Sequence, residues 1–294
     1  MRFFIVFLAI SGAFIFGVST GLYKHFPFNL IVDTKNLISS NTKTGNITKF
    51  SMCDIPISKY VKKDSHAFIG HAYGSEKNNK DDGYISKNAL NFIQNNKFNL
   101  KTIVFTGDVF GIPSIDKWNK LKFDIGSEID ILVAPGNHDI KRPDSRDIFL
   151  LSRFGEKIYP SIKYINKTPL ILENSIDSNW KTLASTIDIA NNLKSESIII
   201  ARHNPPTVDL SSVTNSESGA SSNLETVEEL VKKFNEDKKF YWLIGDGGKS
   251  PYLPRLSCYN FKNHTFIING LGSISGDSIV IYNEKRFYEY KIEF

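Results

Sequence analysis

Apolar runs alternate with amphipathic segments along most of this chain, and this alternation predicts its secondary structure. Short apolar runs rich in β-branched and aromatic residues indicate buried strands, whereas apolar residues that recur every third or fourth position indicate helices. The expected helices cover 84–96, 114–123, 145–154, 180–193 and 224–235. The expected strands cover 102–105, 131–133, 197–201, 241–244, 256–261, 265–268, 278–282 and 287–292, with extended chain over 162–176.

The order of these elements predicts the fold class. Strands and helices alternate up to residue 244, and only short β runs follow in the C-terminal part. This order favours an α/β fold in which two sheets pack face to face and helices cover their outer surfaces. We therefore expect a two-sheet β-sandwich flanked by helices.

The N-terminal segment has a different character. Residues 3–23 contain no charged side chain and are largely apolar, with Arg2 before them and Lys24–His25 after them. A stretch of this length can cross a bilayer as one helix. A cleaved signal peptide is the alternative, although Val18–Ser19–Thr20 is a mediocre cleavage site. We favour an uncleaved anchor over 1–23, and under both interpretations the remainder is periplasmic or extracellular, and secreted if the segment is cleaved.

Composition divides the rest of the chain into two parts. Residues 24–60 are rich in Asn, Thr, Ser and Lys, which is typical of a linker. Residues 61–294 are enough for one large core and leave no room for a second catalytic domain. Export would allow Cys53 and Cys258 to form a disulfide, and two free thiols are the alternative.

Charge excludes one class of function. The formal net charge is +5, and the lysines are scattered rather than gathered into one basic run. Nucleic-acid binding is therefore not expected, although a positive potential would help to attract a phosphorylated substrate.

Candidate chemistry lies in three short blocks that follow apolar strands. These blocks are Thr106–Gly107–Asp108, Gly136–Asn137–His138–Asp139 and Arg202–His203–Asn204. Each block supplies a residue type that binds metals. Because ligands of open α/β sheets bind beyond the carboxyl ends of strands, the three blocks should converge in space. Each block alone has a structural interpretation as a helix cap or a tight turn, but together they indicate a site.

The order and spacing of these blocks resemble those of the calcineurin-like metallophosphoesterases over residues 66–283. The resemblance implies a four-layer α/β/β/α sandwich. Two motifs of that family are altered in this chain. At the opening Asp-x-His-Gly motif, His71 takes the place of the Asp and Tyr73 that of the His, while a register shifted by two residues would keep His71 as the His. At the closing Gly-His-x-His motif, Asp246 replaces the first His and Gly248 removes the second.

The resemblance also implies which residues bind metal. One ion would be held by Asp108, Asn137, His203 and Asp246. A second, weakened position would keep His71 and Asp108, while Tyr73 is more typical of a pocket wall than of a ligand. Carboxylate, amide and imidazole groups together suit Mn, Fe or Zn, so we expect one or two divalent ions.

The mechanism implied by the resemblance assigns roles to further residues. His138 protonates the leaving alkoxide and is held by Asp139. Arg202 and Lys249 are candidates for a phosphate contact, but we favour a solvated surface role for each. The expected function is hydrolysis of phosphate mono- or diesters by an exported, membrane-anchored domain. A cell-envelope glycan or a lipid-linked phosphate is the expected substrate. The alternative is a catalytically inactive relative that acts as a binding or interaction module, which the altered motifs favour.

Overall fold

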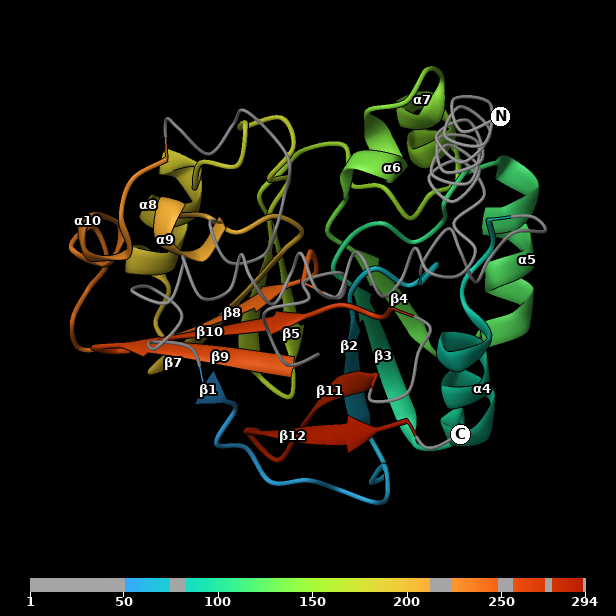
Figure 1. Cartoon of the computed structure of the whole chain (residues 1–294), viewed down its shortest axis with the longest axis horizontal. Helices are drawn as coiled ribbons and strands as arrows, with labels where there is room; N and C mark the ends of the chain where they lie inside the picture. The colour runs from blue at the N-terminus through green and yellow to red at the C-terminus, as the bar shows by residue number, and fades with distance from the viewer. Residues whose placement is uncertain (1–50, 75–82, 212–223, 248–255, 273–276, 293–294) are drawn as a thin grey trace, which may run out of the picture. The chain divides into compact units, whose positions relative to one another are not determined.

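Two mixed β-sheets form the frame of the protein, as a computed structural model shows (Figure 1). The structure describes residues 51–74, 83–211, 224–247, 256–272 and 277–292. They belong to one compact unit, Lys49–Phe294. The expected membrane anchor at 1–23 lies outside the described residues. None of the described helices combines the length and apolar character that a bilayer crossing requires.

The five-stranded sheet has three parallel strands, which are followed along the sheet by two antiparallel ones. Its strand order is β12-β11-β2-β3-β4, with β2, β3 and β4 parallel and β11 and β12 antiparallel. The bounds are β2 (Ser65–Ile69), β3 (Leu100–Phe105), β4 (Asp130–Val133), β11 (Ser278–Asn283) and β12 (Arg286–Lys291).

The seven-stranded sheet has a parallel centre and antiparallel margins. Its order is β1-β9-β10-β8-β7-β6-β5, in which β10, β8, β7 and β6 run parallel. The bounds are β1 (Ser51–Met52), β5 (Ser161–Ile165), β6 (Thr168–Leu172), β7 (Ser197–Arg202), β8 (Lys239–Ile244), β9 (Leu256–Phe261) and β10 (His264–Asn269).

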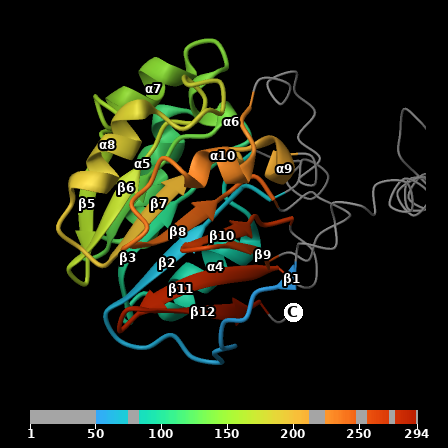
Figure 2. The same cartoon turned by 90° about the vertical axis from the view of Figure 1, so that its left-hand side faces the viewer.

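The helices lie beside the sheets, and their starts follow from local capping. Ser86 and Ser114 accept hydrogen bonds from the backbone N–H three residues later, and Thr226 forms a capping box with Glu229. In Figure 1, α4 and α5 lie beside the five-stranded sheet and α8, α9 and α10 beside the seven-stranded sheet. Figure 2 shows α6 and α7 together at one end of the sheets. The bounds are α4 (Lys87–Asn96), α5 (Ile115–Ile125), α6 (Asn137–Ile140), α7 (Ser145–Leu151), α8 (Ala184–Asn192), α9 (Val208–Ser211) and α10 (Val227–Val231).

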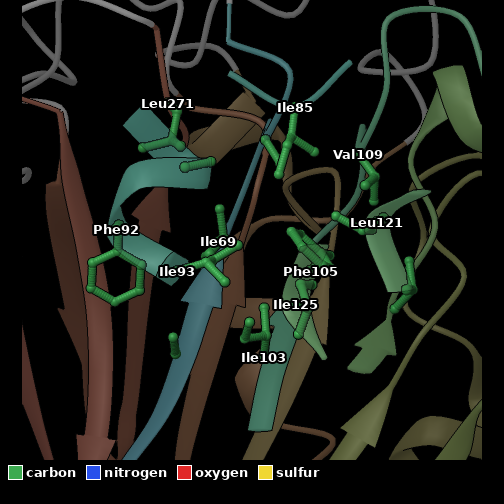
Figure 3. Close-up of a cluster of buried hydrophobic side chains, with 14 of the residues drawn as sticks. Ile69, Ile85, Phe92, Ile93, Ile103, Phe105, Val109, Leu121, Ile125 and Leu271 are labelled. Carbon is green, nitrogen blue, oxygen red and sulfur yellow. The ribbon is translucent and has the colours of Figure 1, made fainter. Parts of the chain in front are cut away.

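Strand β3 is buried on both faces and therefore contributes to two hydrophobic clusters. Its side chains point alternately to opposite faces of the sheet. Ile103 and Phe105 pack with Ile93 of α4 and Leu121 of α5 (Figure 3). Val104 belongs instead to a cluster that contains side chains of both sheets. The mixed α/β class is confirmed, and these layers are compatible with the expected two-sheet α/β sandwich.

The outer face of the seven-stranded sheet is covered by aromatic packing. Phe234, which follows α10, lies against Phe240 and Trp242 of β8 with ring centroids 4.8 and 5.6 Å apart. Edge-to-face pairs of this kind add to the stabilisation from burial. The helical layer is thereby attached to the centre of the sheet, close to the strands that end at the candidate site.

The boundary expected at residue 60 is too late, because the preceding residues already belong to the compact unit. Strand β1 pairs antiparallel with β9, and Ile57 forms a bridge with Glu289 of β12. Cys53 and Cys258 form a disulfide, which settles the alternative left open by the sequence. The polar composition of 24–60 indicates a linker, but long-range pairing holds its described part, 51–60, against the domain.

Removing this disulfide should destabilise the domain. The bond joins residues separated by 205 positions and therefore restricts the unfolded chain strongly. The double variant Cys53→Ser, Cys258→Ser should lose about 2–4 kcal/mol of unfolding free energy, measured by urea denaturation. Reductant should lower the stability of the wild type to that of the variant and leave the variant unchanged. Equal midpoints for oxidised wild type and variant would contradict this expectation.

Candidate functional site

The candidate site begins where parallel strands of both sheets end. Ile69, Phe105 and Val133 are paired across β2, β3 and β4, so the residues after them emerge side by side. Arg202 and Ile244 are paired in the same way at the ends of β7 and β8. The convergence expected from the strand-end argument is thus observed for the residues that follow these strands.

Gly245 allows the two sheets to meet at this point. A Cβ atom at this position would lie 1.8 Å from the carbonyl oxygen of Thr106, a distance that no side chain could tolerate. The same carbonyl oxygen is 3.0 Å from Nδ1 of His203 and accepts its hydrogen bond. The backbone after β3 therefore contacts both the turn after β8 and the imidazole that follows β7.

Asp108 occupies the centre of the polar cluster. Its Oδ2 atom lies 3.4 Å from Nε2 of His203 and 3.7 Å from Nε2 of His71, and all three side chains are buried. Its Oδ1 atom accepts a hydrogen bond from the backbone N–H of His138 at 2.9 Å. Burial alone would raise the pKa of Asp108, but the neighbouring imidazoles, chiefly His203, hold this pKa below its usual value.

The backbone of this cluster is strained. Asp108 and His71 have φ angles of 55° and 51°, in the left-handed region that residues with a Cβ atom rarely adopt. Such conformations persist only where surrounding contacts enforce them, and they concentrate at functional sites. The N–H of His71 donates to the carbonyl oxygen of Gly107 at 3.1 Å, so the two strained turns support each other.

His203 is oriented as a potential metal ligand. The Thr106 carbonyl can only accept, so Nδ1 carries the proton and Nε2 is the atom directed at Asp108. Nε2 is fully buried and makes no hydrogen bond. Burial lowers the pKa of His203, but the charges of Asp108 and Asp246 outweigh this effect and raise the pKa. At metal sites a ligating histidine commonly donates its other ring N–H to a backbone carbonyl, as Nδ1 of His203 does to Thr106.

Asp139 supports the backbone of the site rather than the His138 ring. Its Oδ2 atom accepts from the N–H groups of Asp108 (2.8 Å) and Gly136 (2.9 Å), and its Oδ1 atom from that of Val109 (3.1 Å). The expectation that Asp139 holds the His138 ring is therefore wrong, because its bonds to Asp108 and Val109 join two turns and its bond to Gly136 lies within one of them. The His138 ring is oriented by its Nδ1 contact with the Gly111 carbonyl at 2.8 Å.

Asn137 and Tyr73 are both neighbours of His138, the first in the chain and the second in space. Asn137 is the first residue of α6 and directly precedes His138, and both side chains are partly exposed. Tyr73 is buried, and its ring centroid lies 4.4 Å from that of His71 and 5.1 Å from that of His138. Tyr73 therefore forms a wall that joins the two imidazoles.

Asp246 is hydrogen-bonded both to His203 and to the neighbouring Asn204. The N–H of Asp246 donates to the His203 carbonyl at 3.0 Å, and its Oδ2 atom accepts from Nδ2 of Asn204 at 3.1 Å. Ser175 contacts the Asn204 side-chain oxygen and accepts from its backbone N–H at 3.0 Å. Asn204 was part of a predicted block, but its role as the partner of Asp246 was missed.

Arg202 is buried in an ion pair, which corrects both expected roles, the phosphate contact and the solvated surface residue. Its side chain is fully buried and pairs with Glu173 at 2.6 Å. It also donates to the carbonyl oxygens of Asn204 and Trp180. The pair was missed, although a charged residue such as Glu173 directly after a buried strand is a recognisable signal. The other expected phosphate contact, Lys249, and the altered Gly248 lie outside the described residues.

The donor set can be compared with the requirements of a metal ion. Two ligands bound to one tetrahedral ion at about 2.0–2.1 Å lie about 3.4 Å apart. The distances from Asp108 Oδ2 to Nε2 of His203 and of His71 both approach this value. The buried Nε2 of His203 has no hydrogen-bond partner and could serve as a metal ligand. Within the described residues, however, no group of three or more His, Cys, Asp or Glu side chains is arranged to hold an ion. The fit thus extends to two pairs of ligand atoms that share Asp108, and a complete centre would also need Asn137 or Asp246 as a ligand.

Comparison with known proteins gives no assignment, because no family model and no curated protein matches the chain. Fold and site together define a mixed α/β protein with a carboxylate–imidazole cluster at converging strand ends.

Replacing Asp139 should show that it supports the turns around Asp108. Asp139→Asn presents an amide group to N–H donors and leaves at least one of them unpaired. The free energy of unfolding should fall by about 1–3 kcal/mol, measured by urea denaturation. The same change at the exposed Asp188 of α8 should have an effect below about 0.5 kcal/mol. Equal stability of the two variants would contradict the supporting role.

Proposed function

We propose that this protein is a metal-dependent hydrolase of phosphate esters, similar to the calcineurin-like metallophosphoesterases in fold and site. The observation that carries the proposal is the position of Asp108. Its carboxylate is buried between two imidazoles, on a strained turn at converging strand ends. This arrangement costs folding free energy, so we infer that it is retained for function. The finer fold that accompanies this proposal is the four-layer α/β/β/α sandwich.

Five residues would hold the metal. One ion would be bound by Asp108, Asn137, His203 and Asp246. A second, weaker position would be formed by His71 together with the shared Asp108. Their oxygen and nitrogen donors suit Mn, Fe or Zn. One or two divalent ions bound there would supply a Lewis acid that offsets the negative charge on the phosphate.

His138 would act as the general acid. The Gly111 carbonyl accepts from Nδ1, which leaves Nε2 as the atom that exchanges a proton. In the reaction, a bond forms between phosphorus and the oxygen of water while the bond to the alcohol oxygen breaks. The alcohol oxygen takes the proton from Nε2 of His138, and the water releases a proton to solvent. Asp139 contributes by holding the turns that carry Asp108 and His138.

The domain would act on its substrate outside the cytoplasm. A disulfide such as that between Cys53 and Cys258 forms in oxidising compartments, which agrees with export behind an N-terminal anchor or signal peptide. A phosphate ester of a cell-envelope glycan or of a lipid is then the substrate class to test, as a mono- or diester.

A binding module without catalysis is the second candidate. The observation that favours it is that the described residues hold no complete group of three charged or imidazole ligands. Gly248 and the lost opening Asp point in the same direction. Such a module would bind phosphate-bearing ligands without turning them over.

Two substitutions distinguish the candidates. His138→Ala should leave metal content unchanged and lower kcat by about 10²- to 10⁴-fold on alkyl phosphates, with a smaller loss on aryl phosphates, whose leaving groups need no proton. His203→Ala should instead lower the metal content measured by mass spectrometry, with partial recovery of turnover in excess metal. Each variant serves as the control for the other, with folding checked by circular dichroism. A metal-free wild type without turnover in Mn, Fe or Zn would favour the binding module.

A further inference from the structure

A cavity of about 280 Å³ lies beside the candidate site, between α6, α7 and the segment that follows β6. Much of its wall is apolar. The apolar side chains that line it are Pro135, Ile140, Phe149, Leu150, Tyr159 and Leu183. The cavity is large enough for a short alkyl chain or a single ring, although it is smaller than a typical cavity for a drug-sized ligand.

One wall of the cavity is continuous with the block that carries His138. Pro135 and Ile140 directly flank Gly136–Asn137–His138–Asp139, so the cavity adjoins the short helix α6 that carries His138. Asp139 ties this helix to the turn of Asp108. The wall of the cavity and the proposed reacting residues are therefore carried by the same connected turns.

The opposite wall is attached to the turn that carries His203. Asn174 and Leu183 line the cavity. Glu173 accepts from the N–H of Leu183 at 2.8 Å and pairs with Arg202, and Ser175 bonds Asn204. The cavity thus spans the ends of β4 and β6, next in each sheet to the strands that end at the cluster.

Four charged side chains line the cavity, and the three besides Lys157 are held in ion pairs, which leaves the apolar surface as the main recognition feature. Arg146 pairs with Asp177 at 2.8 Å, and Glu156 pairs with Lys163 at 2.6 Å. The Tyr159 hydroxyl donates to the Val133 carbonyl at 3.0 Å. A sugar would need several unoccupied hydrogen-bonding groups here, whereas an alkyl group needs only the apolar wall.

We propose that this cavity receives the apolar alcohol part of the phosphate-ester substrate, which makes the substrate a phosphate ester of a lipid-like alcohol rather than of a glycan. The inference rests on the proposed hydrolase function and extends it to substrate class. Leu150 is the residue that determines this specificity, because it lines the cavity from α7 and is only partly covered.

A series of n-alkyl phosphates from methyl to octyl tests the proposal. Beyond the shortest members these alcohols are nearly equal as leaving groups, so differences in kcat/KM report binding of the chain. For the wild type, kcat/KM should rise about fourfold with each methylene until the cavity is full. Glycerol phosphate, with a polar alcohol, should be turned over no faster than methyl phosphate.

The neighbouring leucine supplies a matched control. Leu150→Asp should remove the dependence on chain length, so that octyl phosphate is turned over with about the same kcat/KM as methyl phosphate. Leu151→Asp makes the same charge change on the same helix at a residue 71% exposed that does not line the cavity, and it should keep the dependence. Binding of radiolabelled 1-octanol, measured by equilibrium dialysis, should weaken about tenfold or more in Leu150→Asp alone.

The outcomes separate this proposal from the hydrolase function. Turnover with no dependence on chain length, or equal octanol binding by all three proteins, would overturn the cavity assignment and leave the hydrolase. Octanol binding that depends on Leu150, without turnover of any ester in any metal, would overturn the hydrolase and with it the substrate assignment.

Discussion

The contact between the two sheets at Thr106 is the constraint on which the rest of the site depends. One carbonyl oxygen accepts from the His203 ring and also lies against Gly245. Because the chain segments that meet there come from β3, β7 and β8, no single element could form the Asp108 cluster alone. The sandwich must close before the carboxylate and the imidazoles meet, so the site is a product of tertiary packing and not of a local motif.

A second constraint is the fully buried pair of Arg202 and Glu173. Removing two charges from water is unfavourable, and such a pair is retained only where further hydrogen bonds satisfy its remaining atoms. Here the guanidinium binds the Asn204 and Trp180 carbonyls, and the carboxylate binds Leu183 and Thr186. The pair therefore fixes both one wall of the cavity and the turn of His203, which links the shape of the cavity to the geometry of the cluster.

Much of the fold was predictable, because apolar periodicity and capping are local properties. Strand β9 has the expected bounds, and α5 begins at Ile115, one residue after its predicted start at Ser114. Helix α8 begins at Ala184 rather than at residue 180, since the segment before it is held by Arg202 and not by helical bonds. The convergence of Asp108, His138 and His203 followed from strand ends. The partners of Asp139 and Arg202 did not, because they depend on turns that only the packed sheets define.

The short strand β1 has a consequence for the behaviour of the protein towards other copies of itself. The edge of a sheet exposes unpaired backbone groups that can recruit a strand from another molecule. In this protein Ser51–Met52 occupies the edge beside β9, and the adjoining disulfide fastens it there. A strand of this length offers little further edge for pairing. The covalent bond thus protects the seven-stranded sheet from intermolecular strand addition at this margin, in addition to stabilising the single chain.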